Sequence, residues 1–340
     1  MRAGRKGNRL EVSLLIDVLC LRPEADFLAV GVTPPTELAI AYRDPADDDV
    51  SALLASARAL VLPSAGQALN EEWFASVPNL QLIQFTGAGW DRISQATLRQ
   101  AGCYVANVPG VNAIDVAEYV LLTAGMLLRN IKLGDALIRQ GRYVEARREL
   151  AAENVRGFRG ITVGVVGLGH IGYTVGKVLH SLGASVMFYD PQPRYADEAA
   201  ALGFAQTSLE DLLRHADVIT LHVPLLPQTR GLIGRAQLEW VKPDAVIVHA
   251  SRGGVVDEAA LLERLTAGAI RAVALDVYTS EPLPSDSSIL EAAKSLEGRL
   301  LLTPHIAGVT RQAAAALYAT AWENVARVLL EEATPLHQVI

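Results

Sequence analysis

Short apolar runs alternate with longer amphipathic stretches through the middle and C-terminal part of the chain. Runs rich in β-branched residues predict buried strands, because a strand covered on both faces needs few polar positions. We expect such strands at 161–166, 185–189, 218–222, 245–249, 272–277 and 300–302, and a last helix over about 312–331. Strands that alternate with helices are typical of a parallel, doubly wound sheet.

The same alternation precedes residue 107. Apolar runs predict strands at 12–19, 59–62, 80–85 and 104–106, and helical spacing covers 70–76 and 94–101. A segment with Pro109 and Gly110 then breaks the pattern before the helices predicted at 113–129 and 131–140, and 141–160 is a polar surface excursion. The sequence therefore predicts two α/β domains that meet near residue 110.

Composition narrows the class of protein. The 340 residues are 51% apolar and carry a net charge of −7, which argues against a nucleic-acid partner. A basic stretch at 2–9 precedes an apolar run that Glu11 and Asp17 interrupt, so we interpret it as a disordered tail rather than a signal peptide. The apolar run at 119–128 is too short to span a bilayer. Two cysteines with apolar neighbours favour buried thiols and a cytoplasmic setting.

A glycine fingerprint follows the strand predicted at 161–166. It contains Gly167, Gly169, His170, Ile171 and Gly172. The three glycines suit a tight turn, the approach of a pyrophosphate to the backbone, and close packing of helix on strand. The N-terminus of the following helix favours an anion, so the turn predicts a dinucleotide site.

An acid follows at the spacing that such a site requires. Asp190 lies at the end of the next predicted strand, 18 residues after Gly172, where a carboxylate accepts hydrogen bonds from the adenosine ribose. A carboxylate there repels a 2′-phosphate, which favours NAD over NADP, although Arg194 lies close enough to weaken that preference.

Three ionisable residues follow later strands. Arg252, Glu281 and His305 come after the strands at 245–249, 272–277 and 300–302, at the edge where parallel sheets bind ligands. Singly, each is as easily a surface or turn residue. Together, Arg252 offers a planar fork for a carboxylate, His305 an imidazole that titrates near neutral pH, and Glu281 a partner that orients it. This set suits hydride exchange with a 2-hydroxy acid.

A second glycine loop follows the strand at 80–85. Gly87, Ala88 and Gly89 expose backbone N–H groups that suit an anion such as a carboxylate. An ordinary glycine turn is an equal interpretation.

These motifs, in this order, resemble the D-isomer-specific 2-hydroxyacid dehydrogenase family. The similarity covers most of the chain, in the segments 87–91, 116–118 with Asn107, 165–172, 222–225, 251–257, 276–278 with 281–282, and 303–308. The family includes phosphoglycerate dehydrogenases, D-lactate dehydrogenases and glyoxylate or hydroxypyruvate reductases. The resemblance therefore implies an NAD-dependent oxidoreductase acting on a small D-2-hydroxy or 2-oxo acid.

The resemblance also implies an architecture and a set of sites. It implies two Rossmann-like doubly wound domains with a cleft between them: residues 1–110 with 307–340 for the substrate, and 111–306 for NAD. It makes Arg252, Glu281 and His305 catalytic and implies a homodimer that pairs through the cofactor domain, with no metal. Further cofactor contacts are Gly167, Gly169, His170, Ile171, Gly172, Asp190, His222, Val223, Pro224, Ala250, Ser251, Arg252, Asp276 and His305, and the substrate contacts are Gly87, Ala88, Gly89, Arg252 and His305.

Two departures from the family pattern affect the substrate and the site. Phe85 stands where phosphoglycerate dehydrogenase-like members often carry arginine, which weakens the expectation of phosphate binding, although Arg92 or Arg311 offers charge. His249 stands where asparagine is usual, and we interpret it as a structural histidine. Alternative functions are an NAD-sensing, corepressor-like binding protein and an oxidoreductase of formate or phosphite.

Overall fold

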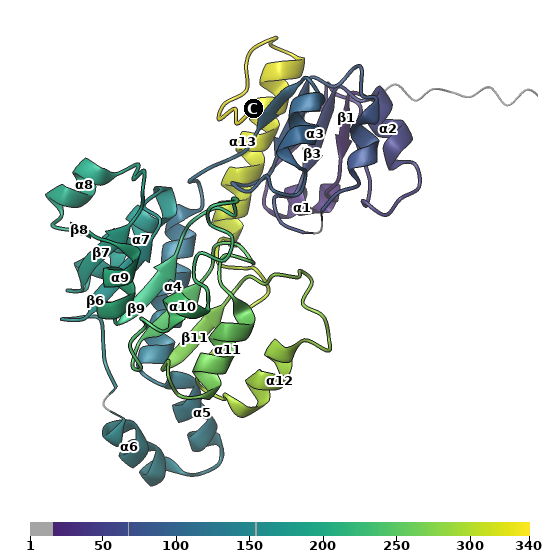
Figure 1. The fold of residues 1–340 in the computed structure, drawn as a ribbon. Helices are drawn as coiled ribbons and strands as arrows, with labels where there is room; N and C mark the ends of the chain where they lie inside the picture. Colours follow the sequence, from purple (N-terminus) through teal and green to yellow (C-terminus); the bar gives the residue numbers. More distant parts are fainter. Residues whose placement is uncertain (1–15, 67, 154) are drawn as a thin grey trace, which may run out of the picture. The chain divides into compact units, whose positions relative to one another are not determined.

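The chain folds into two compact units. The computed structural model describes residues 16–340 except 67 and 154. One unit extends to Val108 and is completed by Tyr318–Ile340, and the other is Pro109–Leu317 (Figure 1). The predicted basic tail and Glu11 lie outside the described residues, as does the first part of the strand expected at 12–19.

The first unit is built on a five-stranded parallel sheet. Its strand order, β2-β1-β3-β4-β5, is that of flavodoxin-like folds. In these folds the order in which strands are added to the sheet reverses beside the first strand. The strands are β1 (Val18–Cys20), β2 (Ile40–Tyr42), β3 (Ala59–Leu62), β4 (Leu82–Phe85) and β5 (Tyr104–Ala106). The helices are α1 (Glu24–Ala29), α2 (Val50–Ser56), the 3₁₀ helix η1 (Glu71–Ala75) and α3 (Gln95–Gln100).

The C-terminal segment completes this unit through buried side chains that contact its sheet and its first helix. Asn324 is fully buried, and its Nδ2 donates to Gln84 Oε1 at 2.8 Å while its Oδ1 accepts from Leu336 N at 2.7 Å. Phe27 also packs edge-on against the ring of Trp322, with centroids 5.3 Å apart. The Asn324 side chain thus holds two distant segments together, because a buried hydrogen-bonding group that loses its partner costs free energy.

The second unit is built on a seven-stranded parallel sheet. Its order, β12-β11-β10-β9-β6-β7-β8, is the dinucleotide-binding order with one strand added at the β12 edge. The strands are β6 (Thr162–Val166), β7 (Ser185–Tyr189), β8 (Ala205–Gln206), β9 (Val218–Leu221), β10 (Val246–His249), β11 (Ala272–Leu275) and β12 (Leu300–Leu302). The two parallel sheets confirm the predicted doubly wound α/β class.

Helices cover both faces of this sheet, which explains the apolar strands. Val120 of α4 and Leu179 of α7 belong to one buried cluster, and Leu212 of α9 and Leu261 of α11 belong to the other. The helices are α4 (Ala113–Leu128), α5 (Ile131–Arg139), α6 (Tyr143–Ala152), α7 (His170–Ser181), α8 (Ala196–Ala201), α9 (Leu209–His215), α10 (Arg235–Leu238), α11 (Glu258–Thr266), α12 (Ser288–Ser295) and α13 (Arg311–Leu329), whose last turns belong to the first unit.

Some elements differ from the predictions. The stretch expected to be helical at 70–76 is the 3₁₀ helix η1, and the polar excursion at 141–160 contains α6. The short strands β2 and β8 were not expected.

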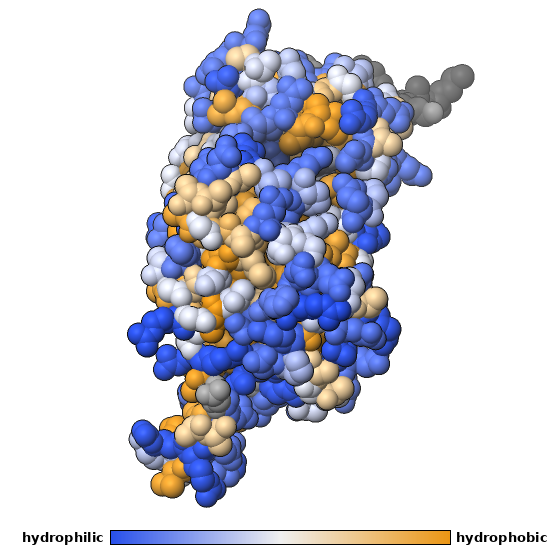
Figure 2. Space-filling view, turned by 60° about the vertical axis from the view of Figure 1, so that its left-hand side comes forward, coloured by the Kyte–Doolittle hydropathy of each residue, from blue (hydrophilic) through white to orange (hydrophobic). Residues whose placement is uncertain are grey.

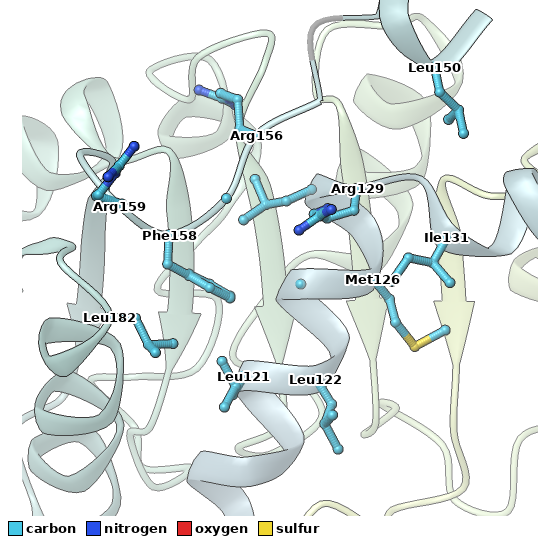
Figure 3. A pocket seen from close by; sticks show the side chains of 13 residues that line it. Leu121, Leu122, Met126, Arg129, Ile131, Leu150, Arg156, Phe158, Arg159 and Leu182 are labelled. Atoms are coloured by element: carbon cyan, nitrogen blue, oxygen red, sulfur yellow. The ribbon is translucent and has the colours of Figure 1, made fainter. Parts of the chain in front are cut away.

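An apolar groove of about 850 Å³ lies beside α4 in the second unit (Figure 3). Leu121, Leu122 and Met126 line it from α4, and Phe158 and Leu182 line it from other segments. Leu122 is 64% exposed, a high value for leucine. Figure 2 shows further hydrophobic residues at the surface, among the hydrophilic ones.

Candidate active site

Register brings three predicted residues to one edge of the seven-stranded sheet. Val166 pairs with Tyr189 on one side and with Leu221 on the other. The residues that follow these partners are Gly167, Asp190 and His222. They therefore meet at the carboxyl edge, where the strand order reverses and ligands bind in folds of this kind.

The glycine turn is shaped for an anion. Gly167 has a φ of 95°, and a Cβ there would lie 2.8 Å from His222 O. A Cβ on Gly172 would lie 1.9 Å from Gly167 O, so helix α7 can start this close to the turn only with glycine. Above Gly169, by contrast, a Cβ would meet nothing within 4 Å. This open space before the N-terminus of α7 fits a pyrophosphate.

Asp190 supports the glycine turn. Its Oδ2 accepts a hydrogen bond from Leu168 N at 2.7 Å, and its Oδ1 accepts from Gln192 N at 2.8 Å. Each carboxylate oxygen can accept a further bond. The sequence indicated the acid but not its bond to the glycine turn.

His170 begins α7 in contact with aromatic residues. Its Nδ1 lies 2.6 Å from the Tyr195 hydroxyl, and the Tyr195 ring stacks on Tyr173 with centroids 4.7 Å apart. A Cβ on Gly110 would lie 2.8 Å from the His170 ring, so this glycine admits the imidazole. The imidazole is thereby fixed at the start of α7, next to the glycine turn.

Two histidines follow neighbouring strands, His249 fully buried and His222 half-buried. His222 Nε2 lies 2.8 Å from Thr220 Oγ1, while its Nδ1 is buried without a hydrogen-bond partner. His249 is fully buried, and its Nδ1 lies 3.4 Å from Ser251 Oγ. Burial lowers the pKa of His222 to about 3 and that of His249 to about 4. Both rings are therefore neutral at pH 7, which agrees with a structural interpretation of His249.

Arg252 lies on a loop held at both ends. The loop leaves β10 through Ala250 and the buried Ser251, whose carbonyl oxygen accepts from Arg252 Nη1 at 2.9 Å. It enters α11 at Asp257, whose Oδ1 caps the helix by accepting from Ala260 N at 3.0 Å. The arginine is thus carried at the sheet edge by an anchored segment.

Glu281 and His305, two of the predicted residues, contact each other through their side chains. Glu281 Oε2 lies 2.8 Å from His305 Nδ1, and both side chains are about three-quarters buried. The other oxygen, Oε1, accepts from Tyr278 N at 3.0 Å. Burial alone would raise the pKa of Glu281, but the hydrogen bond and charge of His305 hold it below its usual value. Glu281 is therefore an ionised carboxylate that orients the imidazole.

His305 has a backbone conformation that needs support. Its φ is 55°, in the left-handed region that non-glycine residues rarely adopt. Its N–H donates to Asp276 O at 2.8 Å. A strained residue is retained where its surroundings fix it, often at functional sites.

Asp276 fixes the histidine loop. It is fully buried, and its Oδ1 accepts from Thr303 Oγ1 at 2.6 Å and from Ile306 N at 2.8 Å. Its Oδ2 accepts from Ala307 N at 2.8 Å. The family resemblance implies a cofactor contact for Asp276, whereas no sequence pattern indicates this supporting network.

The glycine loop of the first unit is anchored through its carbonyl groups. Asn107 Nδ2 donates to Ala88 O at 2.7 Å, and Val108 N donates to Gly87 O at 2.9 Å. A Cβ on Gly87 would lie 2.9 Å from Ser64 Oγ, so close packing requires the glycine. Phe85, just before the loop, is fully buried in the core rather than directed to a ligand.

The candidate sources of extra positive charge differ in exposure. Arg92 is 8% exposed, and its Nη1 donates to Pro63 O at 3.2 Å. Arg311, the first residue of α13, is exposed.

Among the described residues, no group of histidine, cysteine and acidic side chains could hold a metal ion. Within the same part of the chain, every helix is too short or too polar to cross a membrane.

Comparison with known proteins places this geometry in context. The sequence model described as "D-isomer specific 2-hydroxyacid dehydrogenase, NAD binding domain" matches residues 121–307. A D-3-phosphoglycerate dehydrogenase of Archaeoglobus fulgidus is 37% identical over 245 residues, which are 72% of this chain and 44% of that protein. A glyoxylate reductase of Thermofilum pendens is 33% identical over 270 residues, or 78% of this chain and 77% of that protein. The chain thus spans less than half of the phosphoglycerate dehydrogenase.

Solved structures share the fold. D-mandelate dehydrogenase of Rhodotorula graminis superposes with a TM-score of 0.81 at 24% identity, covering 95% of this chain and 97% of that one. A D-2-hydroxyisocaproate dehydrogenase gives 0.76 at 25% identity, covering 95% and 98%.

Proposed function

The chain belongs to the D-isomer specific 2-hydroxyacid dehydrogenase family, and from this premise we propose that it is an NAD-dependent oxidoreductase that interconverts a D-2-hydroxy acid and its 2-oxo acid. The Glu281–His305 pair carries the proposal, since it fixes an imidazole by a carboxylate near the carboxyl edge of a dinucleotide-binding sheet. NAD, when bound, supplies the hydride acceptor and NADH the donor.

The glycine turn and Asp190 are the residues that we propose hold the cofactor. The pyrophosphate would lie above Gly169 at the start of α7, and Asp190 would accept from the adenosine ribose. Because Asp190 is anionic, NAD is favoured over NADP. The strand-end residues Val223, Pro224, Ala250 and Ser251 would border the nicotinamide end of the site.

Arg252 and His305 act on the substrate in this proposal. The Arg252 guanidinium binds the substrate carboxylate with two parallel hydrogen bonds and polarises the 2-oxo group. His305 Nδ1 is engaged by Glu281, which leaves Nε2 for the substrate oxygen. In reduction Nε2–H gives its proton to that oxygen, and in oxidation Nε2 removes it, while Glu281 stabilises the imidazolium.

The first unit supplies the substrate-binding loop in this proposal. The carbonyl groups of Gly87 and Ala88 are bonded to Val108 and Asn107, which holds the loop in place. The backbone N–H groups of Gly87, Ala88 and Gly89 would bind the carboxylate of the acid. With Phe85 buried in the core, a phosphate group has no arginine at that position, which favours small acids without phosphate.

A substrate panel tests the proposal. Purified protein is assayed for NADH and NADPH oxidation with glyoxylate, hydroxypyruvate, pyruvate, 2-oxoisocaproate and 3-phosphohydroxypyruvate. We expect turnover of at least one acid with NADH, and a reduction rate that falls as pH rises, because the reaction consumes a proton. His305→Gln should lower kcat by at least about 100-fold and leave NADH binding intact.

Other outcomes of the same panel separate the alternatives. Tight NADH binding with no turnover would indicate an NAD-sensing, corepressor-like protein. The dehydrogenase and reductase among the relatives argue against this alternative. Oxidation of formate or phosphite alone would indicate a different reaction. A His305→Gln variant with nearly full activity would overturn the acid–base role.

We also infer that the chain forms a homodimer through the α4 groove. Figure 1 shows α5 and α6 projecting from the second unit beyond its sheet, and Val144 on α6 is 80% exposed. Leu150 of α6 lines the groove together with Leu122 of α4, and a second copy would cover these apolar side chains. Leu122→Glu should convert a dimer to a monomer in sedimentation analysis, whereas Leu290→Glu on α12, a leucine 36% exposed, should not.

The proposed compartment is the cytoplasm. Cys20 and Cys103 are free thiols in the structure, and burial raises the pKa of Cys20 to about 12, so its thiol is protonated and unreactive. Free cysteines agree with a reducing compartment. Cell fractionation followed by immunodetection tests this placement.

A further inference from the structure

Glu258 connects two of the loops that carry the proposed catalytic residues. It is the first residue of α11, just beyond the Arg252 loop. Its Oε1 accepts hydrogen bonds from Thr279 N at 2.5 Å and from Thr279 Oγ1 at 2.8 Å. Thr279 lies between β11 and Glu281, so one carboxylate oxygen joins the arginine loop to the glutamate loop.

The two loops are also in direct backbone contact. A Cβ on Gly253 would lie 1.8 Å from Tyr278 O and 2.6 Å from Thr279 N. Gly253 directly follows Arg252. Because no side chain separates the two backbones, a shift of the 278–279 segment requires Gly253, and hence Arg252, to adjust.

The same segment determines where Glu281 lies. Tyr278 N donates to Glu281 Oε1 at 3.0 Å, and Glu281 Oε2 lies 2.8 Å from His305 Nδ1. The Tyr278 hydroxyl donates to Thr303 O at 2.9 Å, which ties this segment to the histidine loop as well. A path of hydrogen bonds, completed by the peptide bond between Tyr278 and Thr279, thus leads from Glu258 through Glu281 to His305.

We propose that Glu258 is a positioning residue, which holds the arginine loop and the Glu281–His305 pair in one fixed arrangement through Thr279. This inference rests on the proposed function for the roles of Arg252 and His305. A carboxylate suits the task because its hydrogen bonds are shorter and stronger than those of a neutral acceptor. Misplacement of reacting groups by about 1 Å is enough to lower the rate by as much as about 100-fold.

The test compares Glu258→Ala with Glu258→Gln. The alanine variant loses both bonds to Thr279, so we expect kcat for oxo-acid reduction to fall about tenfold or more, with the dissociation constant of NADH changed less than about twofold. The glutamine variant retains an oxygen that accepts both bonds and should stay within about threefold of the parent. Glu263→Gln, at an exposed position of the same helix that pairs with Arg235, is the matched control and should change nothing.

A second readout does not depend on turnover. The imidazole signals of His305 are recorded by NMR at one pH and identified by their loss in His305→Gln. Glu258→Ala should shift them toward their positions in Glu281→Gln, because a less fixed Glu281 weakens its hydrogen bond to His305 Nδ1. In Glu281→Gln that hydrogen bond is already altered, so adding Glu258→Ala there should have little further effect.

Several results would overturn the inference. Unchanged His305 signals in Glu258→Ala, even with a lower melting temperature, would make the residue merely structural. Equal losses in the alanine and glutamine variants would reject the role of the two bonds. If the parent protein reduces no acid, the proposed function fails, but the NMR comparison still decides whether Glu258 positions the Glu281–His305 pair.

Discussion

His249 is fully buried at the end of β10, and its Nε2 is buried without a hydrogen-bond partner. Burial lowers its pKa to about 4, whereas an unfolded histidine titrates near 6.5. Between these values the unfolded chain binds a proton that the folded chain does not. The free energy of unfolding must therefore rise with pH in this range and fall on acidification.

The size of the effect follows from the two pKa values. A pH of 5 lies about 1.5 units below the pKa of the unfolded histidine, which is therefore almost fully protonated. The folded histidine is mostly neutral at the same pH. At about 1.4 kcal/mol per unit, His249 lowers the stability by roughly 2 kcal/mol between pH 7 and pH 5. His222, with its pKa lowered to about 3 by burial, acts in the same direction.

Urea unfolding at pH 7, 6 and 5 measures this effect in the parent protein and in His249→Asn. Asparagine cannot titrate, so the fall in unfolding free energy should be about 2 kcal/mol smaller in the variant. His215→Asn, which replaces an exposed histidine at the end of α9, should follow the parent protein. Equal falls in the parent and His249→Asn would refute the reasoning, because a buried neutral histidine must make the two differ.

Three further predictions concern the proposed sites. Arg252→Lys should raise the KM for the oxo acid by about tenfold or more and leave NADH binding unchanged, because lysine lacks the planar fork; equal loss of both would contradict this role. Asp190→Ala should raise the ratio of NADPH to NADH use by roughly tenfold, which corresponds to about 1.4 kcal/mol, and an unchanged ratio would reject the ribose contact. Gly253→Ala should lower the stability by about 1–3 kcal/mol and reduce turnover, because its Cβ would lie 1.8 Å from Tyr278 O; a variant with the parent's melting temperature and rate would contradict the close packing.

The sequence was most informative where periodicity and glycine spacing act together. The strands at 59–62, 104–106, 185–189 and 300–302 have the predicted bounds, because each is a short apolar run in a sheet covered on both faces. The spacing from Gly172 to Asp190 reflects one helix and one strand, so it placed the acid beside the turn.

Elements that are charge-rich or very short escaped prediction. Helix α6 carries four charged residues among its ten, and the edge strands β2 and β8 are only three and two residues long. The support of the proposed site was equally hidden. Asp276, Glu258 and Tyr278 act through contacts between loops about 20–30 residues apart, and no local pattern encodes such contacts.

The division of the chain also governs how the protein is made. The first unit is interrupted after Val108 and resumes only at Tyr318, so the second unit is in effect an insertion of roughly two hundred residues within it. At about 5–20 residues per second, the ribosome needs about 10–40 s to pass from one part of the first unit to the other. During that interval the five-stranded sheet lacks Asn324, and Gln84 lacks its buried partner. The second unit, which is continuous, can fold first, and a nascent chain stalled before Tyr318 would hold a completed cofactor domain beside an unfinished neighbour.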